Sequence, residues 1–365
     1  MIDETERPLE ARRADGDAGG RPAGNQGRRR PQQRKIKRSN VNGWLILDKP
    51  VGMTSTEAVA AAKRMFNAAK AGHAGTLDPL ASGCLPIAFG EATKTVPFVV
   101  DGRKVYRFTV RWGVETDTDD TEGKPVATSD ARPTRAEIEA LLPRFLGEIS
   151  QVPPRYSAIK IAGERAYDLA REGEVVELEP RTVEIHRLAI VGQPDADHVE
   201  IEAECGKGTY VRALARDFGR LLGCYGHVSA LRRLVVGPFD EEDLVPLAEV
   251  EEAGAHLAGG VDEEGRPTRP PAAAIAAARG HFLLPIEAAL SDLPEITVDR
   301  VEAGRLMRGQ SIILRGRNLP PIGETVYATT GGRLLALGEV ERGSFVPRRV
   351  FHVGRPERGG GEDHC

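Results

Sequence analysis

The chain has 365 residues and a formal net charge of −4, with 40% hydrophobic and 28% charged residues. These values are ordinary for a soluble globular protein and leave room for more than one domain. No apolar run approaches the roughly 20 residues that a membrane helix needs, and the polar N-terminus lacks the apolar region of a secretory signal. The four cysteines are scattered and form no ligand cluster with the eight histidines. We therefore expect a reducing, cytoplasmic location, no metal site and no cofactor.

The charge is unevenly distributed along the chain. Residues 1–40 carry 11 Lys/Arg and 6 Asp/Glu, whereas residues 240–264 carry 10 Asp/Glu and no Lys or Arg. The rest of the chain has a net charge of only +1, so the overall charge does not exclude a nucleic-acid partner. Residues 1–40 contain few large apolar side chains, which predicts a disordered basic tail. This segment is either a solvated tail or an arm that raises RNA affinity by counterion release.

A stretch rich in glycine and proline, residues 72–94, carries Asp78 just before a proline. The glycines allow backbone torsions that are closed to other residues, and Pro79 biases Asp78 toward an extended conformation. The pattern predicts a loop that holds one carboxylate with little helix or strand around it. A helix is predicted in its second half, ending near Phe98. These residues alone leave two interpretations open, an ordinary Asp-Pro surface turn and a functional site.

Clear patterns of secondary structure surround this loop. Residues 43–49 form a short apolar run that predicts a strand, and Thr54 or Ser55 can cap the helix that follows. Apolar and polar side chains alternate over residues 104–112, which predicts a second strand. Residues 134–147 have the apolar spacing of an amphipathic helix.

Two charged features invite structural rather than functional interpretations. Residues 116–123 have the composition of a metal-binding loop but not EF-hand spacing, so we expect a solvated acidic turn. A helix is predicted to begin at an N-cap Thr209 and to carry Arg212, Arg216 and Arg220 along one face. An arginine spaced in this way is usually a solvated helix charge.

Residues 151–175 combine two tyrosines with basic side chains. Such a segment is typical of an RNA-facing surface, where rings stack on bases and cations hold phosphates. Within it, residues 151–160 are predicted to be extended and residues 165–173 to form a short helix. Beyond it, residues 183–191 and 198–204 alternate in polarity and predict a pair of strands.

The composition changes after Phe239. Residues 241–282 are acidic and then rich in proline and alanine, which predicts an insertion or linker. Short alternating runs separated by glycine and proline follow within residues 283–353, and they predict a small all-β domain. Residues 354–365 are expected to be a loose tail.

Four segments together resemble the bacterial tRNA pseudouridine synthase family that modifies uridine 55 in the TΨC arm. They are residues 43–55, 73–94, 156–173 and 208–239. The run His-Ala-Gly-Thr-Leu-Asp-Pro-Leu-Ala-Ser-Gly is specific to this family. The resemblance implies an α/β (α+β) catalytic core, residues 41–240, with a mixed and mainly antiparallel sheet. It also implies that residues 283–353 form a small PUA-like RNA-binding domain.

The resemblance also implies an active site. Asp78 matches the catalytic aspartate of the family, and Arg212 matches the arginine that pairs with it and aims it. Tyr106 matches the tyrosine that packs on the target base and handles the C5 proton, although spacing alone makes it a strand core residue. Further substrate contacts are implied at His73, against the flipped base or its phosphate, at Tyr210 and Leu231, lining the uridine pocket, and at Lys49, as a structural or phosphate contact.

The implied reaction breaks the N1–C1′ bond of uridine, turns the base and rejoins C1′ to C5. The sequence leaves open whether Asp78 attacks C1′, attacks C6 or removes a proton from C2′. The target base is stacked within the folded tRNA, so it must be flipped out. We expect tRNA as partner through its TΨC stem-loop, no membrane association and a monomer. The alternatives are a non-catalytic tRNA-binding or folding protein and a pseudouridine synthase acting on another RNA.

Overall fold

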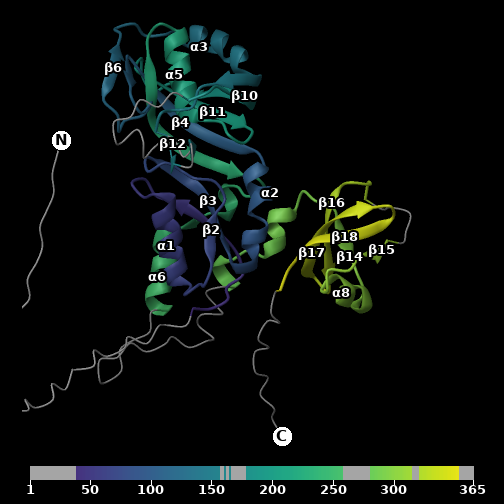
Figure 1. Ribbon diagram of the computed structural model, residues 1–365. Helices are drawn as coiled ribbons and strands as arrows, with labels where there is room; N and C mark the ends of the chain where they lie inside the picture. Colours follow the sequence, from purple (N-terminus) through teal and green to yellow (C-terminus); the bar gives the residue numbers. More distant parts are fainter. Residues whose placement is uncertain are drawn as a thin grey trace, which may run out of the picture. The chain divides into compact units, whose positions relative to one another are not determined.

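The structure, a computed structural model, describes residues 38–156, 160–161, 164–165, 178–257, 280–314 and 320–352 (Figure 1). A nine-stranded sheet forms the centre of the larger part of the described chain. Its strands in spatial order are β13 (Val245–Pro246), β1 (Gly43–Lys49), β3 (Ala81–Phe89), β12 (Gly226–Val236), β4 (Lys104–Trp112), β11 (His198–Cys205), β10 (Arg181–Gly192) and β7 (Gly147–Gln151), with β2 (Ala71–His73) paired to β3. The β1–β13 and β3–β12 pairs are parallel and the other pairs are antiparallel. The predicted mixed, mainly antiparallel sheet is therefore confirmed.

Both faces of this sheet are covered by apolar side chains. In β1, Leu45 and Leu47 enter one core, which includes side chains of α1 (Ser55–Met65) and α5 (Val211–Leu221). Trp44 and Ile46 alternate with them and enter a second core on the opposite face. The second core is shared with α2 (Val96–Asp101) and the 3₁₀ helix η4 (Ile286–Leu290). The period-two alternation of a strand produces this division.

The predicted helices and strands of the core are mostly confirmed. The helix α1 is N-capped by Thr54, which forms a capping box with Glu57. The strand β4 and the antiparallel pair β10–β11 lie where the alternation placed them. The amphipathic segment at 134–147 forms α3 (Arg135–Leu141) followed by the 3₁₀ helix η2 (Leu142–Phe145).

Several short elements lie around the nine-stranded sheet. They are β5 (Val114–Thr116) paired with β6 (Pro125–Thr128), β8 (Lys160–Ile161) paired with β9 (Glu164–Arg165), and the 3₁₀ helix η1 (Gly90–Lys94). The helix predicted at 165–173 lies outside the described residues except for its first position, which ends β9. Of the described cysteines, Cys84, Cys205 and Cys224 are buried and unpaired. No helix in the described ranges is both long and apolar enough to cross a membrane.

The helix predicted in the second half of the Asp78 loop is correct only over its last part, where η1 and α2 lie, and is wrong before Gly90. Residues 81–89 form β3, which lies inside the sheet and is buried along nearly its whole length. A strand covered on both faces is apolar at successive positions, so the alternation that identifies a strand is missing. The prediction of little strand around the loop is also wrong, because the strands β2 and β3 flank the loop directly and pair with each other.

The acidic stretch predicted to be a linker contributes in part to the core. It begins with the 3₁₀ helix η3 (Glu241–Asp243), then β13 at the edge of the sheet, then α6 (Leu247–Leu257). Figure 1 shows α6 beside α1, and Val250 of α6 enters the core. Residues 258–279 lie outside the described part of the chain, as does the predicted tail at residues 354–365. The predicted tail at residues 1–40 lies outside it up to residue 37, whereas Ser39 forms a β-bridge with Ala68.

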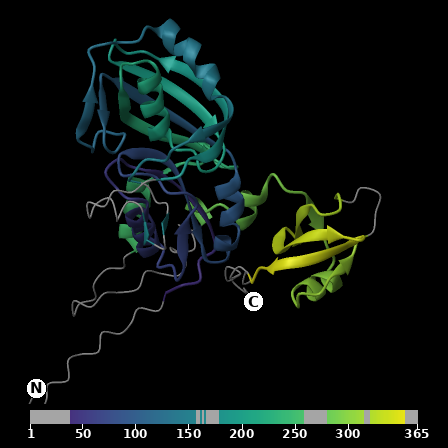
Figure 2. The same cartoon turned by 45° about the horizontal axis from the view of Figure 1, so that its top comes forward.

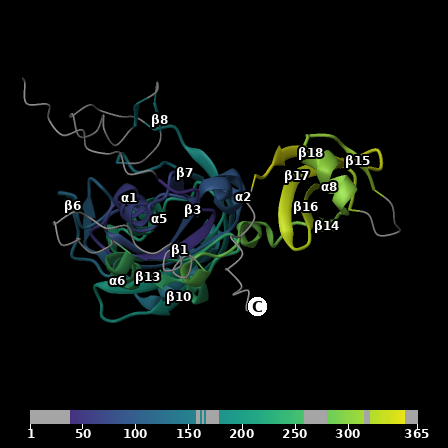
Figure 3. The ribbon, with the colours of Figure 1, turned by 90° about the horizontal axis from the view of Figure 1, so that it is seen from below.

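A second sheet is formed near the C-terminus (Figure 2 and Figure 3). It has an apolar core of its own. Its strands in spatial order are β14 (Glu295–Thr297), β16 (Thr325–Thr330), β17 (Arg333–Glu341), β18 (Ser344–Val350) and β15 (Ile312–Ile313). The predicted β-rich unit is confirmed, but it is not all-β. The helix α8 (Arg300–Leu306) starts at Asp299, whose carboxylate accepts hydrogen bonds from the backbone N–H groups of Val301 and Glu302. This cap follows β14 directly and ends the alternation there.

Gly83 provides a test of how closely β3 and β12 approach each other. Its φ is +97°, and a Cβ at this position would lie 2.2 Å from the carbonyl oxygen of Arg233. We predict that Gly83→Ala lowers the free energy of unfolding by at least about 3 kcal/mol, since backbone strain and overlap with a fixed carbonyl combine. The measurement is denaturant unfolding of the purified protein.

Gly52→Ala is the matched control, because Gly52 has a φ of +86° and no atom within 4 Å of its added Cβ. It should cost only the strain of the left-handed backbone, about 1–2 kcal/mol. Equal losses for the two variants would contradict the close approach at Gly83.

Candidate active site

The loop that carries Asp78 is fixed by the start of α1. The hydroxyl of Ser55 donates to the carbonyl oxygen of Leu77 at 3.0 Å and accepts from the Leu77 N–H at 2.8 Å. The N–H of Gly52 donates to the carbonyl oxygen of Pro79 at 2.7 Å. The backbone is therefore held on both sides of Asp78, and its position does not depend on the side chain alone.

A buried guanidinium holds the other side of the same loop. Arg233 of β12 is 1% exposed and donates to the carbonyl oxygens of Cys84 at 2.8 Å, Gly75 at 3.1 Å and Thr76 at 3.4 Å. Gly75 has a φ of +99°, and an added Cβ would lie 3.3 Å from Nη1 of Arg233. Sequence reasoning gave Arg233 no role. The available signal was a charged side chain inside a strand that is otherwise largely apolar.

Asp78 and Arg212 are in direct contact, as the resemblance implied. Nε of Arg212 lies 2.9 Å from Oδ2 of Asp78. The Arg212 side chain is 6% exposed, whereas that of Asp78 is 36% exposed. The carboxylate is thus oriented by a buried cation and still presents surface to a substrate. The alternative of a solvated helix charge at Arg212 is excluded.

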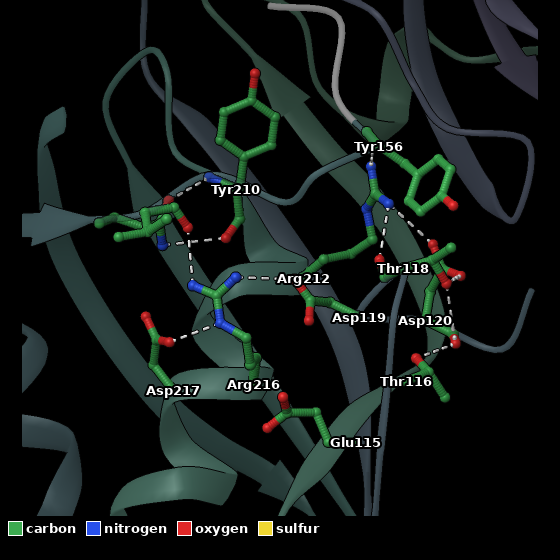
Figure 4. A network of polar contacts seen from close by, with 12 residues as sticks. Glu115, Thr116, Thr118, Asp119, Asp120, Tyr156, Tyr210, Arg212, Arg216 and Asp217 are labelled. Atoms are coloured by element: carbon green, nitrogen blue, oxygen red, sulfur yellow. Dashed lines mark hydrogen bonds and ion pairs between the residues drawn. The ribbon is translucent and has the colours of Figure 1, made fainter. Parts of the chain in front are cut away.

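The acidic turn at residues 116–123 is not solvated as predicted. Asp119 and Asp120 are 5% and 2% exposed, and the backbone N–H of Val228 in β12 donates to the Asp119 carbonyl oxygen at 3.0 Å. Figure 4 shows the turn facing α5. Two ion pairs join the turn to α5: Arg212 with Asp120 (3.1 Å) and Arg216 with Asp119 (3.0 Å). A third joins Arg220 to Glu115 of β5, directly before the turn (2.6 Å). The four-residue spacing of the arginines puts all three on the face that meets the turn.

Asp120 supplies a second carboxylate to Arg212. Nη1 of Arg212 contacts Oδ2 of Asp120 and also donates to the carbonyl oxygen of Thr118 at 3.0 Å. Burying a guanidinium is costly unless its donors are satisfied, and here two carboxylates and the carbonyl oxygens of Thr118 and Tyr156 share that task. The sequence carried no sign of this pairing, because the two residues are 92 positions apart.

Lys49 is buried beside the Asp78 loop. Its exposed fraction is 0%, and its ammonium donates to the carbonyl oxygens of Met53 at 2.7 Å and Pro50 at 2.9 Å. Burial lowers the pKa of Lys49 from its ordinary 10.5 to about 8, although the charge of Asp78 opposes the shift. These contacts favour the structural alternative for Lys49 over a phosphate contact.

Tyr106 and Leu231 lie on adjacent strands. Tyr106 of β4 is paired with Arg233 of β12, and Leu231 is paired with Ala81 at the start of β3, directly after the Asp78 loop. Burial raises the pKa of the Tyr106 phenol, and Arg233 opposes this shift through its charge and a hydrogen bond. Tyr106 also packs against the apolar core. It is therefore a partial core residue, as its spacing indicated.

His73 and Tyr210 lie on the two segments that lead into the site. His73 ends β2 and is paired with Ile87 of β3. Tyr210 is the N-cap residue of α5, so the predicted N-cap Thr209 is wrong. The Thr209 hydroxyl instead donates to the carbonyl oxygen of Gly206 at 3.2 Å. Within the described residues, no group of three His, Cys, Asp or Glu side chains is placed to hold a metal ion.

Two family models match this chain. Residues 63–211 match the TruB family pseudouridylate synthase N-terminal domain, and residues 212–291 match the tRNA pseudouridylate synthase B C-terminal domain. A tRNA pseudouridine synthase B from Bradyrhizobium diazoefficiens is 62% identical over 316 residues, 87% of each chain. Another from Rhodopseudomonas palustris is 61% identical over 329 residues, covering 90% of this chain and 86% of the relative. The chain belongs to the TruB family of pseudouridylate synthases.

This TruB-family chain is accordingly an enzyme of the isomerase class. Solved structures of H/ACA complexes contain chains with a similar fold. The crystal structure of the archaeal box H/ACA sRNP Nop10-Cbf5 complex contains a chain that is 26% identical, with a TM-score of 0.61 and 86% of each chain covered. An H/ACA RNP bound to a substrate RNA containing 2′-deoxyuridine contains a chain at 24% identity, with a TM-score of 0.62 and 85% coverage of each.

The buried ammonium of Lys49 predicts a pH dependence of stability. Between about pH 8 and 10.5, Lys49 is neutral in the folded protein and protonated in the unfolded chain. The unfolded state then binds more protons, so this residue makes the free energy of unfolding rise with pH in that window. We predict that Lys49→Met reduces the slope by up to about 1.4 kcal/mol per pH unit, measured by urea unfolding between pH 8 and 10.

Lys70→Met, which replaces an exposed lysine, is the control and should leave the slope unchanged. A Lys49→Met protein with the wild-type slope would show that Lys49 titrates alike in the folded and unfolded states.

Proposed function

We propose that this enzyme converts uridine 55 in the TΨC arm of tRNA to pseudouridine, with Asp78 as its catalytic group. The observation that carries the proposal is the partly exposed Asp78 carboxylate held 2.9 Å from the buried Arg212, in a chain of the pseudouridylate synthase family. The relatives at about 60% identity named tRNA pseudouridine synthase B support tRNA as the substrate.

The reaction is an isomerisation in which the base leaves C1′ through N1 and returns through C5. The C5 proton is lost and N1 gains a proton, so no group donor is consumed. Asp78 serves as nucleophile toward C1′ or C6, or as base toward the C2′ proton. The ion pair with Arg212 engages Oδ2 and aims the carboxylate before the substrate arrives.

The target uridine must leave the base stack to reach Asp78, at a cost of a few kcal/mol. Tyr106, Tyr210 and Leu231 are proposed to line the pocket that receives the base, with His73 at its edge or against a phosphate. Tyr106 is further proposed to handle the C5 proton. Stacking on aromatic side chains offsets part of the flipping cost.

The remaining parts are proposed to bind the rest of the tRNA. We assign catalysis to the unit around the nine-stranded sheet, residues 41–240 with β13 and α6 added. The β-rich unit within residues 283–353 is proposed to be a PUA-like RNA-binding domain, and the basic stretch near residues 151–175 to face the RNA. We propose that the enzyme acts as a monomer.

The deciding experiment treats unmodified tRNA transcript with the purified protein, with no added cofactor, and maps pseudouridine at single-nucleotide resolution. Product at uridine 55 alone is expected. Product at an unrelated uridine would overturn the substrate assignment, and no product would favour the non-catalytic alternative. Product in another RNA, with none in tRNA, would favour the second alternative.

Asp78→Asn tests the catalytic assignment. The amide keeps the shape of the side chain but loses its nucleophilic and basic character, so we predict that turnover is abolished. Affinity for tRNA should stay within about threefold of wild type, as measured by filter binding. Asp292→Asn, at an exposed site, should retain full turnover. A collapse of tRNA binding in Asp78→Asn would mark the aspartate as structural instead.

A further inference from the structure

The chain that enters the basic, tyrosine-bearing stretch is fastened to the start of α5. Gln151, at the end of β7, is 2% exposed. Its Nε2 donates to the carbonyl oxygen of Tyr210 at 3.2 Å, and its Oε1 accepts from the Tyr210 N–H at 2.8 Å. Figure 4 shows both hydrogen bonds on the Tyr210 backbone. One side-chain amide thus satisfies the donor and the acceptor of a single residue.

This contact is made at the N-terminus of α5, where the helix has no side-chain N-cap hydrogen bond. Helices commonly begin with a Ser, Thr, Asp or Asn side chain that accepts from the first turn. The N-cap of α5 is Tyr210, which makes no such hydrogen bond through its side chain. Gln151 fixes the backbone of this N-cap from outside the helix. Arg212, the partner of Asp78, comes two residues later.

The same segment is held at two further points by α5. Nη2 of Arg216 donates to the Val152 carbonyl oxygen at 2.8 Å, and Nη2 of Arg212 donates to the Tyr156 carbonyl oxygen at 2.9 Å. Pro153 and Pro154 lie between these points and are buried. Two prolines fix their φ torsions and cannot donate hydrogen bonds, so the segment between the contacts is stiff. Residues 151–156 therefore form a strap that fixes the first turns of α5.

We propose that Gln151 is a positioning residue, which holds Tyr210 and the start of α5 so that Arg212 meets Asp78 in the productive geometry. This inference rests on the proposed function. A carboxamide is the side chain required, because it offers a donor and an acceptor side by side. An ionised carboxylate of the same length can only accept, and a thioether of the same length offers neither strong donor nor strong acceptor.

The test uses Gln151→Met and Gln151→Glu in the full chain. Single-turnover pseudouridine formation on unmodified tRNA transcript is measured between pH 5.5 and 8.5, together with tRNA affinity and thermal unfolding. Gln151→Met should lower the rate at least about tenfold with tRNA affinity within about twofold, since a small displacement of catalytic groups is costly. Rates are compared at a temperature where every variant is folded.

Gln151→Glu gives a signature that packing alone does not produce. At pH 8 the carboxylate cannot donate to the Tyr210 carbonyl oxygen, so the rate should fall. As the pH decreases, the protonated carboxyl recovers a donor beside its acceptor. The ratio of the variant rate to the wild-type rate should therefore rise toward one at acidic pH. The control is Thr95→Val, which removes a buried hydrogen bond to the Ala92 carbonyl oxygen and should change stability only.

A folded Gln151→Met protein with the wild-type rate would overturn the inference. So would a Gln151→Glu ratio that does not change with pH, and this second measurement decides the matter if Gln151→Met does not fold. If the wild-type protein itself forms no pseudouridine, the proposed function fails. If the wild-type protein forms pseudouridine and the Gln151 variants do so at the same rate, the proposed function stands and only the role of Gln151 is overturned.

Discussion

A buried guanidinium must find acceptors for its donors, and the candidate active site is organised around how Arg212 meets this requirement. Its partners are the carboxylates of Asp78 and Asp120 and the carbonyl oxygens of Thr118 and Tyr156. These partners come from separate parts of the chain. Because an unpaired buried charge is strongly unfavourable, each part is held in place by the same side chain. The Asp78 carboxylate is therefore oriented by a requirement of the fold.

The Asp78 loop is held in place by the strands and the helix around it. β3 lies inside the sheet with both faces covered. Arg233 of β12 donates to two carbonyl oxygens of the loop, those of Gly75 and Thr76, and to one of β3, that of Cys84. Ser55 ties it to α1 through both polar groups of the Leu77 peptide backbone. Sites supported by packed strands and helices hold their geometry more closely than sites on free loops. Here a loop is given this property by buried side chains from two neighbouring elements.

Elements in which apolar and polar side chains recur with a regular period could be predicted from the sequence. Elements without such a period could not. Alternation located β4 and the β10–β11 pair, and the Thr54 capping signal located α1. The period of β3 is lost because both faces are buried. The sequence predicts a solvated turn at Asp120 because acidic residues are usually solvated, and the cationic partner Arg212 is distant in sequence.

The candidate site was predictable only in part. The contact between Asp78 and Arg212 followed from resemblance, because nothing in their spacing implies it. The sequence predicts Ser55 only as a possible helix cap, whereas its hydroxyl bonds the backbone of Leu77, a contact that exists only in the folded chain. Arg233 and Gln151 act through backbone groups of distant residues, and a backbone partner leaves no mark in the sequence. Side chains of this kind are visible only once the chain is folded.

The parallel pairing of β3 with β12 has a consequence for the order in which the protein becomes competent during synthesis. The Asp78 loop is made early, but the guanidinium groups that hold it belong to residues 212 and 233. Contacts of such long sequence separation form late, since the intervening chain must first be closed. A nascent chain that stops short of β12 (Gly226–Val236) can form the loop's contacts with Gly52 and Ser55 but lacks those with Arg233. The Asp78 loop therefore gains its full set of contacts only after β12 has joined the central sheet.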